Sequence, residues 1–458
     1  MLRKIMEGCV RLRKDGNTIT LLNRKRSLPE LFISYLKNNG LPYAMEKTFK
    51  YLNPRNIRQE YLEIMGILDG KHAYTGPSFI QIDITNDCNN DCIGCWCNSP
   101  LLGDRRLPPK IKSQSLPISL IKSFLDEAAG MGAKEIYYAG GGEPFMHPHI
   151  MEVLEYTKKK GLICYVNTNF TLIDREKVKR LVDLGLDHMT VSVWAGTAQT
   201  YRETHPNKSE ETFLRIKDTL RYLNSLKTSI RKPYIKVYHV ISSINYKEIL
   251  EMVDFALDTD SESLEFTVID TIPGATDKLL LNKDEAEETV RKCDILRSKM
   301  NNGEFRKKLE ILNFDHFYRR ISSSFAEKGQ YDKGLLDELP CYVGWTFARI
   351  LADGNVNSCL KSHRFPVGNI YNQKFLKIWN SPKQIEFRKN ALDPKEGNPF
   401  FKLIGNDPGL KLGCYKSCDD IGRNLYMRSK VSSLDSPKKF LLKNLTRYFN
   451  LRRFYAGV

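Results

Sequence analysis

Short apolar runs alternate with longer stretches of helical spacing along this chain, from residue 79 to residue 270. Each short run is apolar on both faces, which is typical of strands in a parallel sheet covered by helices. The stretches between them repeat apolar residues at helical spacing, and several end in Gly. The pattern predicts strands at 79–85, 135–141, 162–170, 188–195, 234–242 and 263–270, and helices at 118–132, 149–161, 174–185, 209–229 and 246–258.

Six strand–helix units are fewer than the eight of a closed barrel. We therefore expect an α/β fold in which residues 77–305 form a partial (β/α)6 barrel. The alternation stops after residue 305, and residues 306–420 are rich in loops and hold the last four cysteines, which predicts a smaller C-terminal α+β domain. With 458 residues the chain is long enough for two or three domains.

The two ends of the chain are basic. Residues 1–76 carry 14 Lys and Arg against 7 Asp and Glu, and residues 421–458 carry 9 against 1, so most of the net charge of +17 lies there. We interpret residues 1–76 as an N-terminal extension and residues 421–458 as a C-terminal tail. Such ends suit an anionic partner, such as lipid headgroups, nucleic acid or a phosphorylated substrate, and simple solvation is the alternative.

The tail segment 440–456 places apolar residues at helical spacing among basic ones. It predicts reversible contact with an anionic membrane surface, and a helix docked on the body is the alternative. No apolar run approaches the length of a membrane span, and the first residues lack the apolar core of a signal peptide. We expect a cytoplasmic protein with its tail at the inner membrane face. Thiols stay reduced there, and clustered cysteines hold metal more often than they form disulfides.

Three cysteines with the spacing C-x3-C-x2-C, Cys88, Cys92 and Cys95, directly follow the first predicted strand. In barrels of this kind chemistry occurs at the carboxyl ends of the strands. Three thiolates can bind three irons of a [4Fe–4S] cluster and leave the fourth iron open, whereas electron-transfer clusters and structural zinc use four ligands. Cys97 is a fourth thiol nearby, but in an extended backbone its side chain would point away from Cys95.

The sequence GGGEP, residues 140–144, ends the second predicted strand. Consecutive glycines let a ligand approach the backbone and expose N–H groups, and a tight strand–helix turn is the alternative explanation.

These two motifs, in this order on a partial barrel, resemble the radical S-adenosylmethionine (radical SAM) superfamily. The resemblance implies that Cys88, Cys92 and Cys95 hold a [4Fe–4S] cluster whose open iron binds SAM. In that family the reduced cluster cleaves SAM to methionine and a 5′-deoxyadenosyl radical, which takes a hydrogen atom from substrate. The residues that the resemblance places around SAM are Gly141, Gly142 and Glu143 at the amino group, Asn169 at the end of strand three, Ser192 near the ribose and Arg202 near the carboxylate. Capping or surface roles are the alternative for the last three.

This sequence also departs from the family pattern. The family usually has an aromatic residue immediately before the third cysteine, where this chain has Gly94, and Trp96 follows that cysteine instead. Strand four reads SVW where many relatives have SLD, so Trp194 is a candidate for shaping the substrate site. These differences bear on the substrate more than on the cofactor.

The C-terminal cysteines form a second set. Cys341 and Cys359 flank Gly354 with the spacing C-x12-G-x4-C, and Cys414 and Cys418 follow as CYKSC. The first spacing resembles the start of the SPASM and twitch modules, which carry auxiliary iron–sulfur clusters. Four cysteines fit the shorter twitch type, with one auxiliary [4Fe–4S] cluster bound by all four. A tetrahedral zinc site is the alternative.

We therefore predict a radical SAM enzyme, with oxidoreductase chemistry on a small polar, sugar-type or lipid-linked substrate and a reducing electron donor. Peptide side-chain maturation is the second hypothesis, and a non-catalytic zinc or iron–sulfur binding protein is the third. A nucleic-acid substrate is disfavoured, because the body is nearly neutral and shows no stripe of aromatic and basic residues.

Overall fold

The computed structural model describes residues 9–14, 17–22, 54–228, 231–305, 308–336, 338–392, 398–405, 414, 417–437, 439–440 and 444. The predicted membrane-contact segment 440–456 therefore lies almost wholly outside the described residues. None of the helices in the described part of the chain is both long and apolar enough to cross a membrane.

One sheet of ten strands organises the molecule, in the order β12-β11-β10-β3-β4-β5-β6-β7-β8-β9. Strands β3 to β9 run parallel to their neighbours, and β10 runs parallel to β3. Their bounds are β3 Phe79–Asp83, β4 Glu135–Ala139, β5 Ile163–Thr168, β6 His188–Ser192, β7 Tyr234–Ile241, β8 Ser263–Val268, β9 Glu310–Leu312, β10 Phe347–Ile350, β11 Asn355–Asn357 and β12 Gly368–Asn369. A separate hairpin pairs β1 (Cys9–Lys14) with β2 (Asn17–Leu22).

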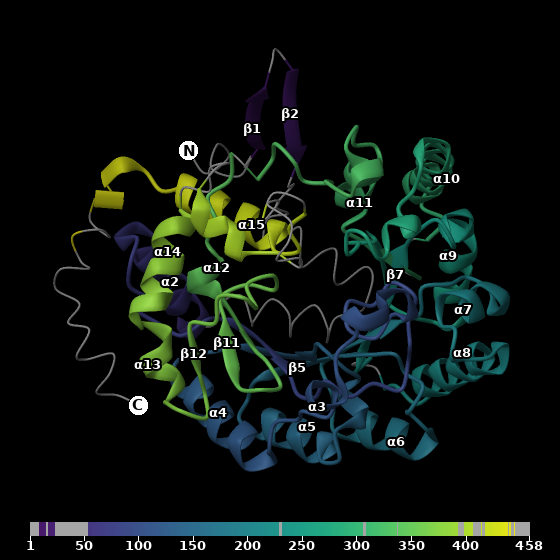
Figure 1. The fold of residues 1–458 in the computed structure, drawn as a ribbon, viewed down its shortest axis with the longest axis horizontal. Helices are drawn as coiled ribbons and strands as arrows, with labels where there is room; N and C mark the ends of the chain where they lie inside the picture. The colour runs from purple at the N-terminus through teal and green to yellow at the C-terminus, as the bar shows by residue number, and fades with distance from the viewer. Residues whose placement is uncertain are drawn as a thin grey trace.

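Helices between the strands pack along the outer side of the curved sheet (Figure 1). The barrel helices are α3 Pro109–Lys112, α4 Ile118–Gly130, α5 Ile150–Lys159, α6 Arg175–Asp183, α7 Ala198–Thr204, α8 Glu210–Ser225, α9 Ile249–Asp258, α10 Lys283–Asn301 and α11 Phe314–Ile321. The remaining helices are α2 Pro54–Asp69, α12 Val343–Thr346, α13 Phe375–Trp379, α14 Pro382–Ala391 and α15 Ile421–Ser432. The prediction of six parallel strands alternating with helices is confirmed.

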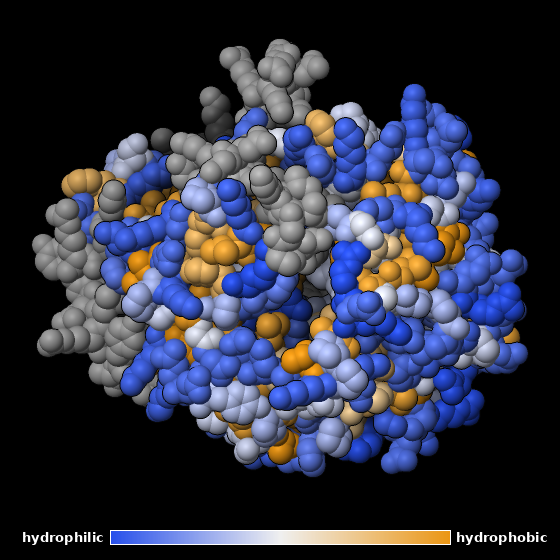
Figure 2. All heavy atoms as spheres, viewed as in Figure 1, coloured by the Kyte–Doolittle hydropathy of each residue, from blue (hydrophilic) through white to orange (hydrophobic). Residues whose placement is uncertain are grey.

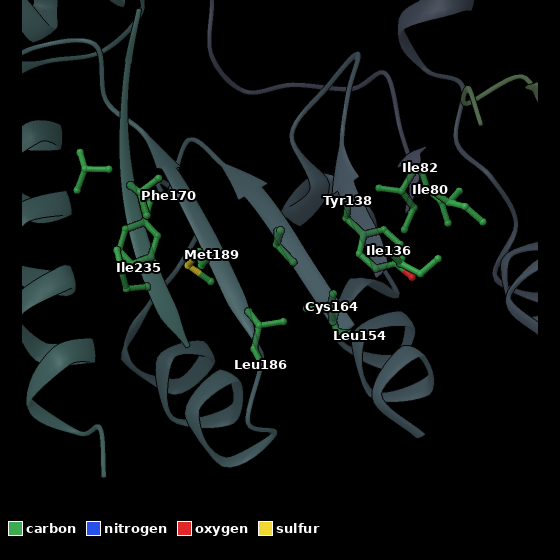
Figure 3. Packing of buried hydrophobic residues seen from close by; sticks show 14 of the residues in the cluster. Ile80, Ile82, Ile136, Tyr138, Leu154, Cys164, Phe170, Leu186, Met189 and Ile235 are labelled. Atoms are coloured by element: carbon green, nitrogen blue, oxygen red, sulfur yellow. The ribbon is translucent and has the colours of Figure 1, made fainter. Parts of the chain in front are cut away.

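The core lies between the sheet and these helices. Ile80, Ile136 and Cys164 stand in register on β3, β4 and β5, are fully buried, and share one cluster with Leu154 of α5 (Figure 3). Alternate residues face the other way, because side chains in a strand alternate between faces. On the visible surface, polar residues predominate and apolar ones appear in small groups (Figure 2).

The C-terminal region joins the barrel directly rather than forming a detached domain. Phe347 of β10 pairs with Phe79 of β3, and their rings stack with centroids 5.8 Å apart. Residues after α2 also contact this region: the Trp345 Nε1 donates to His72 O at 2.9 Å, and Trp379 Nε1 donates to Thr75 O at 2.9 Å. The domain boundary at residue 76 stays a prediction.

Candidate functional site

The loop after β3 holds the first three cysteines, and backbone N–H groups are directed at two of their sulfurs. The nitrogen of Asn90 is 3.4 Å from Cys88 Sγ, and the nitrogens of Cys97 and Asn98 are each 3.4 Å from Cys95 Sγ. Burial raises the pKa of Cys92, and the charges of Cys95 and Cys88 raise it further, so Cys92 lies close to both other cysteines. The three sulfurs that the sequence predicted as ligands are therefore brought together, with donors suited to thiolates.

The expected orientation of Cys97 was wrong. The chain turns at residues 93–94 and 96–98 instead of extending, so the Cys97 thiol reaches back to Cys95. A hydrogen bond from the Cys97 side chain lowers the pKa of Cys95 to about 6, although burial acts in the opposite direction. Burial raises the pKa of Cys88 to about 12. Because burial opposes ionisation of Cys88 and Cys92, all three thiols can be ionised together only if positive charge, such as that of bound iron, is added at this site.

The glycines after β4 allow close backbone contact with the segment that leads to Cys88. A Cβ on Gly142 would lie 2.1 Å from Asp87 O, and a Cβ on Gly140 would lie 2.0 Å from Asp83 Cγ. Gly140 also has a φ of +119°, a conformation that favours glycine. These contacts give the glycine run a local structural role, and the assignment of Gly141 and Gly142 to SAM stays a prediction.

Glu143 joins the ends of β4 and β5. Its carboxylate accepts hydrogen bonds from Thr168 Oγ1 at 2.7 Å, from Asn169 N at 2.7 Å and from Phe145 N at 3.1 Å. The residue is 2% exposed, and burial raises its pKa to about 7, although the three hydrogen bonds act to lower it. In this arrangement the side chain positions the backbone at the two strand ends.

The other three predicted SAM residues differ in their placement. Asn169 lies against the cysteine loop, where its Nδ2 donates to Asn89 Oδ1 at 2.9 Å and lies 4.0 Å from Cys88 Sγ. Ser192 Oγ accepts from Trp194 Nε1 at 2.8 Å. Arg202 is exposed on α7 and pairs with Glu210 Oε1 at 3.1 Å. Only Asn169 of these three is brought to the cysteines, and all three roles stay predictions.

The second cysteine set converges although its members are far apart in the sequence. Burial raises the pKa of both Cys341 and Cys418 well above the usual value, and the charge of Cys414 raises it further. The charge of Cys414 also raises the pKa of Cys359. All three cysteines therefore lie close to Cys414. Within the described residues, no group of three or more His, Cys, Asp and Glu side chains is arranged to hold a single metal ion. The identity of the four as ligands stays a prediction.

Side chains around the second set were not found from the sequence. Asn424 of α15 has its Nδ2 3.7 Å from Cys341 Sγ. Asp332 Oδ2 accepts from Cys418 N at 2.7 Å, and Arg320 Nη2 donates to Cys418 O at 3.0 Å. No spacing or periodicity in the sequence marks these residues, because each acts through a contact between distant segments.

Two family models match the chain. The radical SAM superfamily model matches residues 82–256, and the SPASM iron–sulfur cluster-binding domain model matches residues 341–398. This chain therefore carries a radical SAM domain followed by a SPASM domain. The radical SAM domain implies a SAM-bound [4Fe–4S] cluster, and the SPASM domain implies auxiliary iron–sulfur clusters. The expected number of auxiliary clusters, one, stays a prediction.

This radical SAM protein is similar to curated proteins of differing roles. It is 24% identical over 322 residues to the tungsten-containing aldehyde ferredoxin oxidoreductase cofactor-modifying protein of Pyrococcus furiosus, covering 69% of this chain and 85% of that one. It is 23% identical over 381 residues to the antilisterial bacteriocin subtilosin biosynthesis protein AlbA of Bacillus subtilis, covering 80% and 72%. In fold it resembles Streptococcus suis SuiB bound to S-adenosylmethionine, with a TM-score of 0.55 at 16% identity over 87% of this chain and 92% of that one.

The residues of this radical SAM protein fit clusters at both cysteine sets. At the first, N–H groups are directed at the sulfurs of Cys88 and Cys95. At the second, Asn357 stands two residues before Cys359, is fully buried, and has no hydrogen-bond partner for either side-chain amide atom among the described residues. A buried amide without a partner is costly, so a group that accepts its hydrogen bond fits this position.

Proposed function

We propose that this radical SAM enzyme takes a hydrogen atom from an amino-acid side chain of a peptide, and that its second cysteine set carries one auxiliary [4Fe–4S] cluster. The observation that carries the substrate class is the alignment with AlbA over 80% of this chain, since the name of that protein places it in the biosynthesis of a bacteriocin. The oxidoreductase character and the need for an electron donor are parts of the same proposal.

In this proposal Cys88, Cys92 and Cys95 would hold the first cluster. Reduced and bound to SAM, such a cluster supplies a 5′-deoxyadenosyl radical. Cys341, Cys359, Cys414 and Cys418 would hold the second cluster, and full ligation by four cysteines suits electron transfer. The proposed SAM contacts are Gly141, Gly142, Glu143, Asn169, Ser192 and Arg202.

The sheet face opposite the helix-packed core supports a polar, charged substrate. On β7 and β8, Lys236 Nζ pairs with Glu265 Oε2 at 2.6 Å, and Glu265 Oε1 accepts from Asn313 Nδ2 at 2.6 Å. Lys236 also lies 5.4 Å from the Tyr238 ring centroid. Charged groups of both signs beside an aromatic ring suit the amide, ammonium and carboxylate groups of a peptide.

A small polar substrate, sugar-type or lipid-linked, is the second candidate. The alignment with a cofactor-modifying protein over 69% of this chain favours a small molecule. The same charged face would also bind the hydroxyl and phosphate groups of such a substrate.

The test uses anaerobically reconstituted protein with dithionite and SAM, and measures 5′-deoxyadenosine. The low-molecular-mass fraction of an extract from the source organism is added before or after exhaustive protease digestion. Stimulation of deoxyadenosine formation that digestion abolishes supports the peptide proposal, and stimulation that survives digestion supports the small-molecule candidate. A Cys88→Ala/Cys92→Ala/Cys95→Ala variant is the control, and deoxyadenosine formed equally by that variant would refute the assignment of the first cluster.

A further inference from the structure

The exit of β8 is a junction between the two cysteine sets. Trp96, the residue after Cys95, donates its Nε1 hydrogen to Asp270 O at 2.7 Å. A Cβ on Gly94, the residue before Cys95, would lie 2.4 Å from Ile269 Cδ1. The first cysteine loop therefore rests on residues 269–270 from both sides of Cys95.

Lys361 connects this junction to the second set. Its ammonium donates to Asp270 Oδ2 at 2.5 Å, to Ser417 Oγ at 2.6 Å and to Ser417 O at 3.2 Å. Asp419 Oδ2 lies 3.9 Å away, and Lys361 is only 7% exposed. Lys361 stands two residues after Cys359, and Ser417 immediately precedes Cys418. The buried ammonium of Lys361 thus joins the segments that carry Cys359 and Cys418 to Asp270, which follows β8.

A second tether holds the same segment from the β3 side. Arg349 of β10 donates through Nη1 to Leu360 O at 2.7 Å, and through Nη2 and Nε to Asp83 Oδ2 at 2.6 and 3.0 Å. Asp83 is the last residue of β3, just before the first cysteine loop. Residues 360 and 361 are therefore anchored to the end of β3 through Arg349 and Asp83, and to the segment after β8 through Asp270.

A buried ion pair is weak evidence for stabilisation, because desolvation of the two charges offsets their attraction. Its fixed geometry is better evidence for positioning, since every acceptor of Lys361 adjoins a cysteine segment or the residue that supports one. We propose that Lys361 is a positioning residue that holds Cys359 and Cys418 in fixed register with the Cys95 loop through Asp270. This inference rests on the proposed function, because it requires a cluster at each set.

The experiment compares Lys361→Met with Lys227→Met in the reconstituted full-length protein. Lys227 is the matched control: it is also buried and pairs with a carboxylate, Glu262, at 2.9 Å. The readouts are iron content, the electron paramagnetic resonance (EPR) spectrum of each reduced cluster, the midpoint potential of the second cluster and the melting temperature. Addition of SAM identifies the signal of the first cluster.

We expect Lys361→Met to change the EPR spectrum of the second cluster and to lower its midpoint potential, because a nearby positive charge favours the reduced cluster. The SAM-dependent signal of the first cluster should persist. Lys227→Met should lower the melting temperature while leaving both spectra and the potential unchanged. A Lys361→Met variant with an unchanged spectrum and potential at the second cluster would overturn the proposal.

A double variant keeps the test decisive if Lys361→Met alone does not fold. Lys361→Met with Asp270→Leu leaves neither member of that pair as an unpaired buried charge, so it should recover much of the melting temperature. The positioning proposal expects the second cluster to remain altered in this variant, and a wild-type spectrum there would overturn it. Absence of iron from the second set in the wild type would instead refute the proposed function.

Discussion

Asp332 holds the backbone of Cys418 from a segment far away in the sequence, with its Oδ2 2.7 Å from the Cys418 nitrogen. The same oxygen accepts from Arg320 Nη2 at 2.6 Å, and Arg319 also pairs with this carboxylate. Burial alone would raise the pKa of Asp332, but the Arg320 guanidinium, His316 and Arg319 hold it well below its usual range. The carboxylate is therefore charged whenever the protein is folded near neutral pH.

The change Asp332→Asn should destabilise the protein strongly. It leaves Arg320, which is 4% exposed, without its full counter-charge, and breaking a buried pair in this way costs about 3–5 kcal/mol. Anaerobic denaturant unfolding measures the loss. Asp315→Asn is the matched control, because Asp315 pairs with Arg297 but its side chain is 89% exposed, so that change should cost less than about 1 kcal/mol. Equal losses in the two variants would contradict this account.

A methyl group at Gly142 should disturb the first site. In Gly142→Ala the new Cβ would be forced against Asp87 O, which is backbone and cannot turn aside. We expect a loss of about 1–3 kcal/mol and slower SAM cleavage, because the segment leading to Cys88 must move. Gly422→Ala, in helix α15, is the control: nothing lies within 4 Å of its Cβ, so it should be neutral or stabilising by up to about 1 kcal/mol. A Gly142→Ala variant with wild-type stability and SAM cleavage would show that this close approach is unimportant.

The sequence predicted the barrel because its strands carry their own signal. Runs such as the one around Ile80 and the one around Ile136 are short, apolar on both faces and followed by amphipathic helices, and these local features determine where strands form. The cysteine spacing likewise placed the first site at a strand end. Both are local patterns, which a single sequence displays directly.

The contacts that the sequence did not predict all join distant segments. The pairing of Phe347 with Phe79 makes the C-terminal region part of the barrel sheet, yet β10 is only four residues long. Lys361 and Asp332 are ordinary charged residues in the sequence, and a solvated surface position is the usual explanation for each. The prediction that the Cys97 side chain points away from Cys95 was wrong, because it assumed an extended backbone and the chain turns at this point.

Acid should destabilise the fold partly through His239. This residue of β7 is fully buried, neither ring nitrogen has a partner within the described part of the chain, and burial lowers its pKa to about 3. The unfolded chain takes up a proton near its ordinary pKa of about 6.5 while the folded chain does not, so stability falls as the pH drops through that range. From about pH 7 to about pH 5.5 the loss from this residue is about 1 kcal/mol.

The variant His239→Leu should remove this part of the pH dependence and should be more stable than wild type at the lower pH. Unfolding by denaturant at several pH values measures the slope. His149→Leu is the control, because the side chain of His149 is 54% exposed whereas that of His239 is fully buried. If His239→Leu retains the wild-type slope, the proton uptake belongs to another group.

Substitution of Cys97 tests whether the first cluster has three cysteine ligands or four. Its thiol donates a hydrogen bond to Cys95, one of the three predicted ligands, so by proximity alone it is a candidate fourth ligand. As a donor to a sulfur that already binds iron, however, it would support a ligand rather than serve as one. We expect Cys97→Ala to retain the full iron content and the SAM-dependent EPR change, whereas Cys95→Ala should lose the iron of the first cluster. Iron analysis and EPR with and without SAM measure both outcomes. If Cys97→Ala instead lost as much iron as Cys95→Ala, the first cluster would have four cysteine ligands and no iron open to SAM, and the proposed chemistry would need a different site.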